Sequence, residues 1–203
     1  KSYSQKIKTS QKFQSFQVDH TIVLSQIRVS FEGYVNEGKP LDTSALLSKV
    51  VELFQSCKTS LELFNMLHNM HSSDDSVYVH SLNVSLICRQ IGKWIKADDA
   101  TLDMLTLAGL LHDIGKLKIP TELLNKPGKY TAEEFAQVRL HTQYGYELLK
   151  PLPLDAHIKL AALSHHERCD GTGYPSGLKT NDIDPYARVV AIADVYDAMT
   201  TAR

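Results

Sequence analysis

Two short stretches of the sequence concentrate side chains that bind metal ions. The first begins with the adjacent imidazoles of His165 and His166 and continues into a glycine-rich loop that ends at Pro175. The second is the pair His112 and Asp113, which closes an apolar stretch. Imidazole and carboxylate groups that end hydrophobic segments lie at the edge of a core. Both stretches are therefore suited to holding a divalent metal ion.

Other histidines and one further aspartate lie on the apolar faces of predicted helices. His80 continues an apolar stripe with alternating spacings of three and four between residues 77 and 94. His141 lies on the apolar face of a helix that a capping box at Thr131 opens, together with Phe135, Val138, Gly145 and Leu148. Asp194 is surrounded by apolar residues of the last helix. The groups expected to point inward are His80, His112, Asp113, His141, His165, His166 and Asp194.

A single histidine on an apolar stripe is usually a hydrogen-bonded core residue, and His80 or His141 alone would be interpreted that way. Seven such groups in one small core would each carry a large desolvation cost without a cation. The set contains no thiolate and mixes imidazole with carboxylate, which favours iron or manganese, with zinc as an alternative. Seven ligands exceed what one tetrahedral ion uses. The pattern therefore predicts two divalent ions that share a bridging aspartate.

Composition limits the classes of function. The chain has 203 residues, of which 43% are hydrophobic, and its formal net charge is -1. This near-neutral charge disfavours electrostatic binding of polymeric nucleic acid. Its three cysteines are scattered and form no disulfide framework, so we expect a reducing cytoplasm. No apolar run approaches 18 residues and no signal-peptide pattern opens the sequence, so we expect no membrane insertion.

Every segment of the chain has the periodicity of a helix, and an alternating strand pattern of useful length is absent. We therefore predict an all-α fold. Residues 1–70 form a helical extension that is regulatory or dimerising, and residues 71–203 form a catalytic domain. The apolar stripe of Leu46, Val50 and Phe54 would suit either a homodimer through the N-terminal helices or an intrachain core.

The second part of the chain resembles the HD-GYP phosphodiesterases, a branch of the HD metal-dependent phosphohydrolases. The resemblance covers roughly residues 72–203 and lies in five motifs that occur in the same order. These are Tyr78-Val79-His80-Ser81, then Leu111-His112-Asp113-Ile114-Gly115-Lys116-Leu117-Lys118-Ile119-Pro120, His141 with Gly145, the run from His165 to Pro175, and the run from Ala191 to Thr200. The resemblance implies an HD-type helical bundle core.

The resemblance also implies an activity, namely metal-dependent hydrolysis of cyclic di-GMP to the linear dinucleotide pGpG, with further cleavage to GMP left open. The family's metal ligands fall on the same seven residues. Asp113 corresponds to the bridging carboxylate. Lys116 corresponds to a lysine beside the site that holds a phosphate oxygen and stabilises developing charge. Asp113 and Lys116 are thus the expected catalytic residues. We expect the protein to act in the cytoplasm, on its own or as the cytoplasmic part of a larger sensor.

In the family, the loop with Gly173, Tyr174 and Pro175 borders the substrate. Tyr174 would present a ring for guanine stacking or a hydroxyl for phosphate, or would serve only as a packing lid. Arg203 corresponds to an arginine that contacts substrate phosphate.

Three departures from the family pattern matter. Ser76 stands where some members have a glutamate that binds a third metal, so we expect two ions. The family continues beyond the position of Arg203, so we expect the catalytic domain to be truncated at its C-terminus. Cys169 lies within the histidine-containing run and is expected to be a bystander.

Two alternatives to cyclic di-GMP hydrolysis remain. One is hydrolysis of a related cyclic dinucleotide, such as mixed GMP-AMP, which the Gly-Tyr-Pro loop does not exclude. The other is a catalytically silent receptor that binds the nucleotide and signals through residues 1–70. The presence of all seven ligands argues against a silent receptor.

Overall fold

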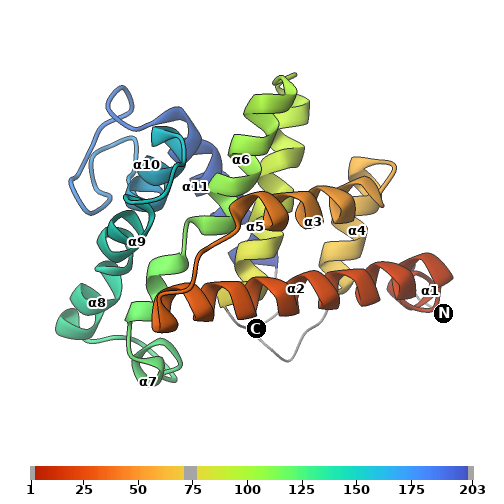
Figure 1. The fold of residues 1–203 in the computed structure, drawn as a ribbon, viewed down its shortest axis with the longest axis horizontal. Helices are drawn as coiled ribbons and strands as arrows, with labels where there is room; N and C mark the ends of the chain where they lie inside the picture. Colours follow the sequence, from red (N-terminus) through yellow and green to blue (C-terminus); the bar gives the residue numbers. More distant parts are fainter. Residues whose placement is uncertain (1–2, 71–76, 201–203) are drawn as a thin grey trace.

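The computed structural model describes residues 3–70 and 77–200, and in these ranges the chain is helical without a β-strand (Figure 1). The helices, in chain order, are α1 (Tyr3–Lys8), α2 (Gln11–Glu37), α3 (Thr43–Gln55), α4 (Ser60–Asn69), α5 (Val77–Trp94), α6 (Asp99–Leu111), the short 3-10 helix η1 (Ile114–Lys118), α7 (Thr121–Leu124), α8 (Ala132–Arg139), α9 (His141–Leu149), α10 (Ala156–Ser164) and α11 (Pro185–Thr200). The prediction of an all-α fold is confirmed.

Helices α5 and α6 form the centre of the molecule and pack against each other along their length (Figure 1). Several of their leucines are almost fully removed from solvent, namely Leu82, Leu86, Leu105 and Leu110. Burial of each such side chain contributes about 1.5–3 kcal/mol relative to leaving it exposed. The pair therefore forms a rigid support on which α10 and α11 also pack.

The long helix α2 crosses below α5 and α6 in Figure 1 and contacts α3, α5 and η1. Ser10 caps its start by accepting a hydrogen bond from the Phe13 amide, and Gly38 ends it in a left-handed conformation with φ of 67°. Its buried face carries Phe13, Phe16, His20, Val23, Ile27 and Phe31. The apolar residues of this face belong to one hydrophobic cluster that continues through α5, α6, α10 and α11.

Leu46, Val50 and Phe54 are also buried within that cluster, so the intrachain core accounts for this stripe. Homodimerisation through the N-terminal helices stays a prediction. The division between residues 70 and 71 also stays a prediction, and residues 71–76 lie outside the described residues.

The capping box predicted at Thr131 is present, and α3, α4 and α6 also begin at a capping residue. The side chain of each capping residue accepts a hydrogen bond from a backbone amide in the first turn, and Thr131 and Glu134 complete a capping box. The capping residues are Asp42, Thr59, Asp98 and Thr131.

Three expectations about local structure are wrong. The helix expected from Thr131 through Leu148 is divided into α8 and α9 at Leu140, whose amide donates to the carbonyls of Gln137 and Val138 in a tightened last turn. Phe135 was expected inside but is 44% exposed, because α8 lies at the periphery. Trp94, expected on the buried stripe of α5, is 57% exposed and stacks on Phe64 at the surface.

The described part of the chain contains no helix that is both long enough and apolar enough to span a bilayer.

Gly115 lets η1 approach α9 closely. A Cβ atom at this position would lie 2.0 Å from the His141 carbonyl oxygen and 2.4 Å from the Gly145 amide nitrogen. Both neighbours are backbone atoms, so neither can move aside cheaply. The close approach brings η1, and the Asp113 that precedes it, next to the first residue of α9.

We expect Gly115→Ala to lower the free energy of unfolding by about 3 kcal/mol, at the upper end of the usual range for overpacking. Gly145→Ala on the facing helix is the matched control, because its added Cβ would meet nothing closer than 3.5 Å. Alanine also favours the helical conformation by up to about 1 kcal/mol over glycine. Urea unfolding of both variants tests this, and equal stabilities would contradict it.

Candidate metal centre

Side chains from five parts of the fold meet at the ends of the central helices. His80 comes from α5, and Asp194 comes from α11. His112 is the C-cap of α6, and Asp113 precedes η1. The remaining imidazoles are His141 at the start of α9, and His165 and His166 at the end of α10. All seven residues predicted from the sequence are brought together.

Asp113 is almost fully buried, at 1% exposed, and its two carboxylate oxygens face different groups of ligands. Oδ1 lies 3.3 Å from Nε2 of His141 and 3.6 Å from Nε2 of His165. Oδ2 lies 3.3 Å from Nε2 of His112 and 3.6 Å from Nε2 of His80. A carboxylate between two sets of nitrogens in this way has the arrangement needed to bridge two ions.

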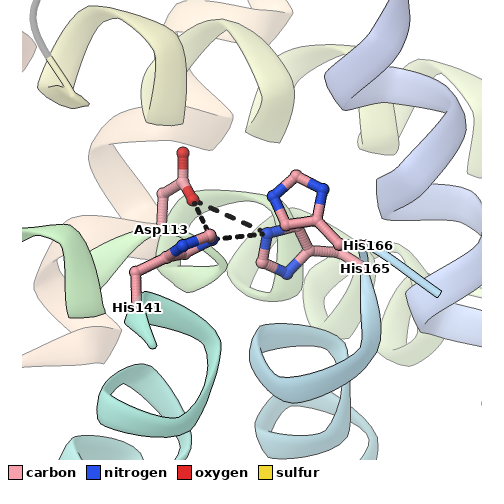
Figure 2. A group of neighbouring side chains, drawn as sticks. All are labelled: Asp113, His141, His165 and His166. Carbon is pink, nitrogen blue, oxygen red and sulfur yellow. Dashed lines mark hydrogen bonds and ion pairs between the residues drawn. The ribbon is translucent and has the colours of Figure 1, made fainter. Parts of the chain in front are cut away.

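Two sets of potential ligand atoms result, and in each set the atoms lie within 4.8 Å of one another. Figure 2 shows the first, in which the side chains of Asp113, His141, His165 and His166 converge from three elements. The second contains His80, His112 and Asp194. Asp194 connects the two sets, because Oδ1 lies 3.0 Å from Nε2 of His80 and Oδ2 lies 4.0 Å from Nδ1 of His166.

Three of the imidazoles are oriented by backbone carbonyls. Nδ1 of His112 donates to the Gly109 carbonyl at 2.7 Å, and Nδ1 of His141 donates to the Val138 carbonyl at 2.7 Å. His165 donates from Nδ1 to the last turn of α10 in the same way. A carbonyl can only accept, so Nδ1 carries the proton and Nε2 has its lone pair directed at Asp113. Metal-binding histidines characteristically have this second hydrogen bond.

Two buried polar atoms at this point have no hydrogen-bond partner, namely Nε2 of His112 and Oδ1 of Asp113. A buried polar group without a partner costs about 1–3 kcal/mol. Both atoms have lone pairs directed at neighbouring ligand atoms, so a cation would satisfy both. The donor set therefore fits a divalent metal.

The charge states also suit a cation. Burial acts to raise the pKa of the Asp113 carboxyl, but the neighbouring His112 imidazole and the Lys116 ammonium outweigh this and hold it well below its usual value. Burial lowers the pKa of His141 to about 3, and burial likewise lowers the pKa of His165 and His166. These three imidazoles are thus neutral at physiological pH and have lone pairs available for a metal.

His80 behaves differently from the other imidazoles. Burial acts to lower its pKa, but hydrogen bonds to Asp194 and Asp197 outweigh burial and raise the pKa to about 9. The same contact with His80, against the effect of burial, lowers the pKa of Asp194. Asp194 and Asp197 therefore stabilise the protonated form of His80.

Lys116 supplies a cation next to the bridging carboxylate. Its ammonium lies 2.5 Å from Oδ2 of Asp113, and its side chain is 25% exposed. Burial acts to lower the pKa of Lys116, but Asp113 outweighs burial and raises it. The lysine is thus charged at physiological pH, and part of its side chain is exposed to solvent.

Comparison with known proteins identifies the family. A family model described as HD domain matches residues 46–203. The chain belongs to the HD domain family. The resemblance predicted from the sequence is confirmed, and so is the HD-type fold.

Several curated proteins are similar to this HD domain. Cyclic di-GMP phosphodiesterase PA4108 of Pseudomonas aeruginosa is 39% identical over 167 residues, covering 82% of this chain and 40% of the relative. A cyclic di-GMP phosphodiesterase of Thermotoga maritima is 38% identical over 148 residues, covering 70% and 39%. The 3'3'-cGAMP-specific phosphodiesterase 2 of Vibrio cholerae is 37% identical over 149 residues, covering 72% and 28%. The chain therefore spans less than half the length of these relatives.

A solved structure shows the same fold. Bd1817, a HDG"Y"P protein from Bdellovibrio bacteriovorus, aligns with a TM-score of 0.75 at 23% sequence identity, covering 92% of this chain and 61% of that chain.

The glycine-rich loop of the HD domain folds back onto the histidines of the candidate metal centre. The Tyr174 amide donates to the His166 carbonyl at 3.2 Å, and the two rings stack with centroids 4.7 Å apart. This path of the loop requires glycine at position 173, because a Cβ atom on Gly173 would lie 2.3 Å from the Arg168 amide nitrogen. The Arg139 guanidinium lies over the Tyr174 ring at 4.4 Å from its centroid. Tyr174 thus already packs against His166 and Arg139, and Pro175 follows it through a cis peptide bond.

Sequence reasoning missed three residues that support the centre. Glu167 is 3% exposed, and its carboxylate accepts hydrogen bonds from the amides of Ser176 and Leu178, which closes the loop. Asp197 accepts from Nδ1 of His80 at 2.8 Å. Arg139 is the third. The position of Asp197, three residues after Asp194 on a helix, is the one signal that could have revealed it.

Two sequence expectations concern residues outside the described ranges. Arg203, expected to contact substrate phosphate, and Ser76, which replaces the ligand of a third metal, both lie there.

We expect Mn²⁺ to raise the melting temperature of the metal-stripped wild type. Binding to the folded state alone contributes about 2.7 kcal/mol of stability at 100 times the dissociation constant. Asp113→Asn should abolish this gain, because the amide nitrogen cannot act as a ligand. Asp182→Asn, at an exposed carboxylate, is the control and should retain the gain. Calorimetry with and without Mn²⁺ measures the effect, and full stabilisation of Asp113→Asn would contradict the bridging role.

Proposed function

We propose that this HD domain is a metal-dependent phosphodiesterase that opens cyclic di-GMP to pGpG. The observation that carries the proposal is the position of the Asp113 carboxylate, with each oxygen facing a separate group of ligands. The names of relatives that are 38–39% identical support cyclic di-GMP as the substrate. The expected location of the activity is the cytoplasm.

The cofactor proposed is a pair of divalent ions, iron or manganese with zinc as the alternative, held by the same seven residues. When bound, divalent ions supply an activated water for attack on phosphorus and neutralise charge on the phosphate oxygens. In the reaction, the water oxygen bonds to phosphorus, the bond to the 3′ oxygen breaks, and that oxygen gains a proton.

The chain's own residues position the phosphate. Lys116 places a compact cation beside Asp113, where it can hold a non-bridging phosphate oxygen and stabilise charge that grows in the transition state. The Tyr174 ring stacks on that of His166, and we propose that it forms one wall of the site and offers its hydroxyl to phosphate. Burial raises the pKa of this hydroxyl, so it remains a donor. Gly173 and Pro175 set the path of the loop that holds the ring, and Arg203 is proposed as a further phosphate contact.

A second candidate substrate is mixed cyclic GMP-AMP. The observation in its favour is the 37% identity to a relative named 3'3'-cGAMP-specific phosphodiesterase 2.

The function is tested with protein purified anaerobically and loaded with Fe²⁺ or Mn²⁺. We expect cyclic di-GMP to give pGpG with a higher kcat/KM than 3'3'-cGAMP, as measured by chromatography of the products. A preference for 3'3'-cGAMP would establish the second candidate instead. If a fully metal-loaded protein returned both nucleotides unchanged, the proposed hydrolysis would be wrong and the catalytically silent receptor would be favoured.

Lys116→Met should lower kcat by about 10²–10³, the usual effect of removing one group that stabilises transition-state charge. Its metal content should stay that of the wild type, because lysine is not among the ligands. Lys129→Met, at an exposed lysine in the loop before α8, is the control and should be fully active. Steady-state kinetics together with metal analysis give both numbers. A normal kcat in Lys116→Met would remove the lysine from the mechanism.

A further inference from the structure

The long helix α2 contains a buried histidine that the proposed reaction does not use. His20 is 2% exposed and lies beside the ring of Phe16, with centroids 5.9 Å apart. It also lies outside residues 46–203, which the HD domain model matches. Burying an imidazole has a desolvation cost, which a hydrogen bond partly offsets. The hydrogen-bond partner of His20 therefore indicates what the residue does in the core.

The hydrogen bond of His20 leads to the metal centre through two further side chains. Nε2 of His20 lies 3.3 Å from Oδ1 of Asn83 on α5. Nδ2 of Asn83 donates to Oδ1 of Asp197 on α11 at 3.0 Å. The other oxygen of Asp197 lies 2.8 Å from Nδ1 of His80. Three helices that are distant in sequence are thus joined in one hydrogen-bonded path.

The chemistry of the groups sets the direction of every bond in this path. A carboxylate only accepts, so the nitrogen of the Asn83 amide must face Asp197. The amide oxygen of Asn83 then faces His20, which must donate from Nε2. The second oxygen of Asp197 accepts from Nδ1 of His80, which directs Nε2 of His80 toward Asp194 and Asp113.

This support differs from that of three other histidines in the described site. His112, His141 and His165 donate from Nδ1 to backbone carbonyls within four residues of themselves. Their orientation therefore depends on local helical structure. His80 depends instead on Asp197, a side chain of another helix.

We propose that His20, Asn83 and Asp197 are positioning residues that fix the ring of His80, so that helix α2 sets the geometry of the metal centre. The proposal rests on the proposed function in that it takes His80 as a metal ligand. Partners of this kind typically change metal affinity by about 10–100-fold when removed. The effect should decrease along the path, from Asp197→Asn through Asn83→Leu to His20→Phe.

The test measures binding of Mn²⁺ alone to metal-stripped protein by calorimetric titration, without nucleotide. We expect His20→Phe to weaken Mn²⁺ binding by about tenfold, because it keeps the packing volume but removes the donor. His20→Gln should restore affinity, because its amide nitrogen reaches the same position as Nε2. A second readout is the proton on Nδ1 of His80 in the NMR spectrum of the metal-free protein, which should exchange faster in His20→Phe.

Tyr34→Phe is the matched control. Tyr34 also lies on α2, and its hydroxyl donates to the Leu148 carbonyl on α9 at 2.5 Å without any connection to His80. Its loss should lower stability without changing the affinity for Mn²⁺ or the NMR signal of His80. Equal effects of Tyr34→Phe and His20→Phe would overturn the proposal, as would unchanged affinity and exchange in His20→Phe.

The outcomes separate this proposal from the proposed function. Tight Mn²⁺ binding without hydrolysis of cyclic di-GMP would overturn the function and leave the path intact. Normal hydrolysis with no response to the variants would overturn only the path. If the wild type bound no Mn²⁺ and the His80 proton did not respond, both would fail.

Discussion

The fold must provide interaction partners for both oxygens of a single buried carboxylate. Asp113 is 1% exposed, and an unpaired anion in such a place would cost several kcal/mol. Histidines from α5, α6, α9 and α10 surround its two oxygens, and Lys116 is the one ammonium in contact with it among the described residues. The start of α5 and the end of α6 must therefore lie close together. The close approach of η1 to α9 at Gly115 brings the start of α9 to the same place.

Helix ends supply most of the ligands, and the physics of helix ends explains why. The last carbonyls of a helix lack intrahelical partners. At the ends of α6, α8 and α10, the histidine that follows donates Nδ1–H to a carbonyl of the last turn. This hydrogen bond directs Nε2 of His112, His141 or His165 inward. The same geometry that ends each helix prepares a ligand for a metal.

Helical periodicity and the residue types at helix ends were sufficient to predict the all-α fold, the capping box at Thr131 and the seven groups that meet at the site, because each depends on local sequence. The break between α8 and α9 was not predictable, because Leu140 keeps helical angles and only the hydrogen bonding changes there. Phe135 continues an apolar stripe on a helix that the fold leaves at the periphery. The roles of Glu167 and Asp197 depend on contacts across nine or more residues, which spacing on one element does not reveal.

Helix α2 belongs to the predicted N-terminal helical extension and contacts three elements that bear the site. His20 reaches α5 through Asn83, Tyr34 donates to the Leu148 carbonyl of α9, and Lys118 of η1 donates to the Val35 carbonyl. Because α5, α9 and η1 respectively carry His80, His141 and Lys116, a shift of α2 would strain all three contacts together. Packed cores resist gradual deformation, so such a shift would favour a discrete rearrangement over a continuous one. Of the three contacts, the one through His20 continues by way of Asn83 and Asp197 to His80, so α2 supports the candidate metal centre at that imidazole.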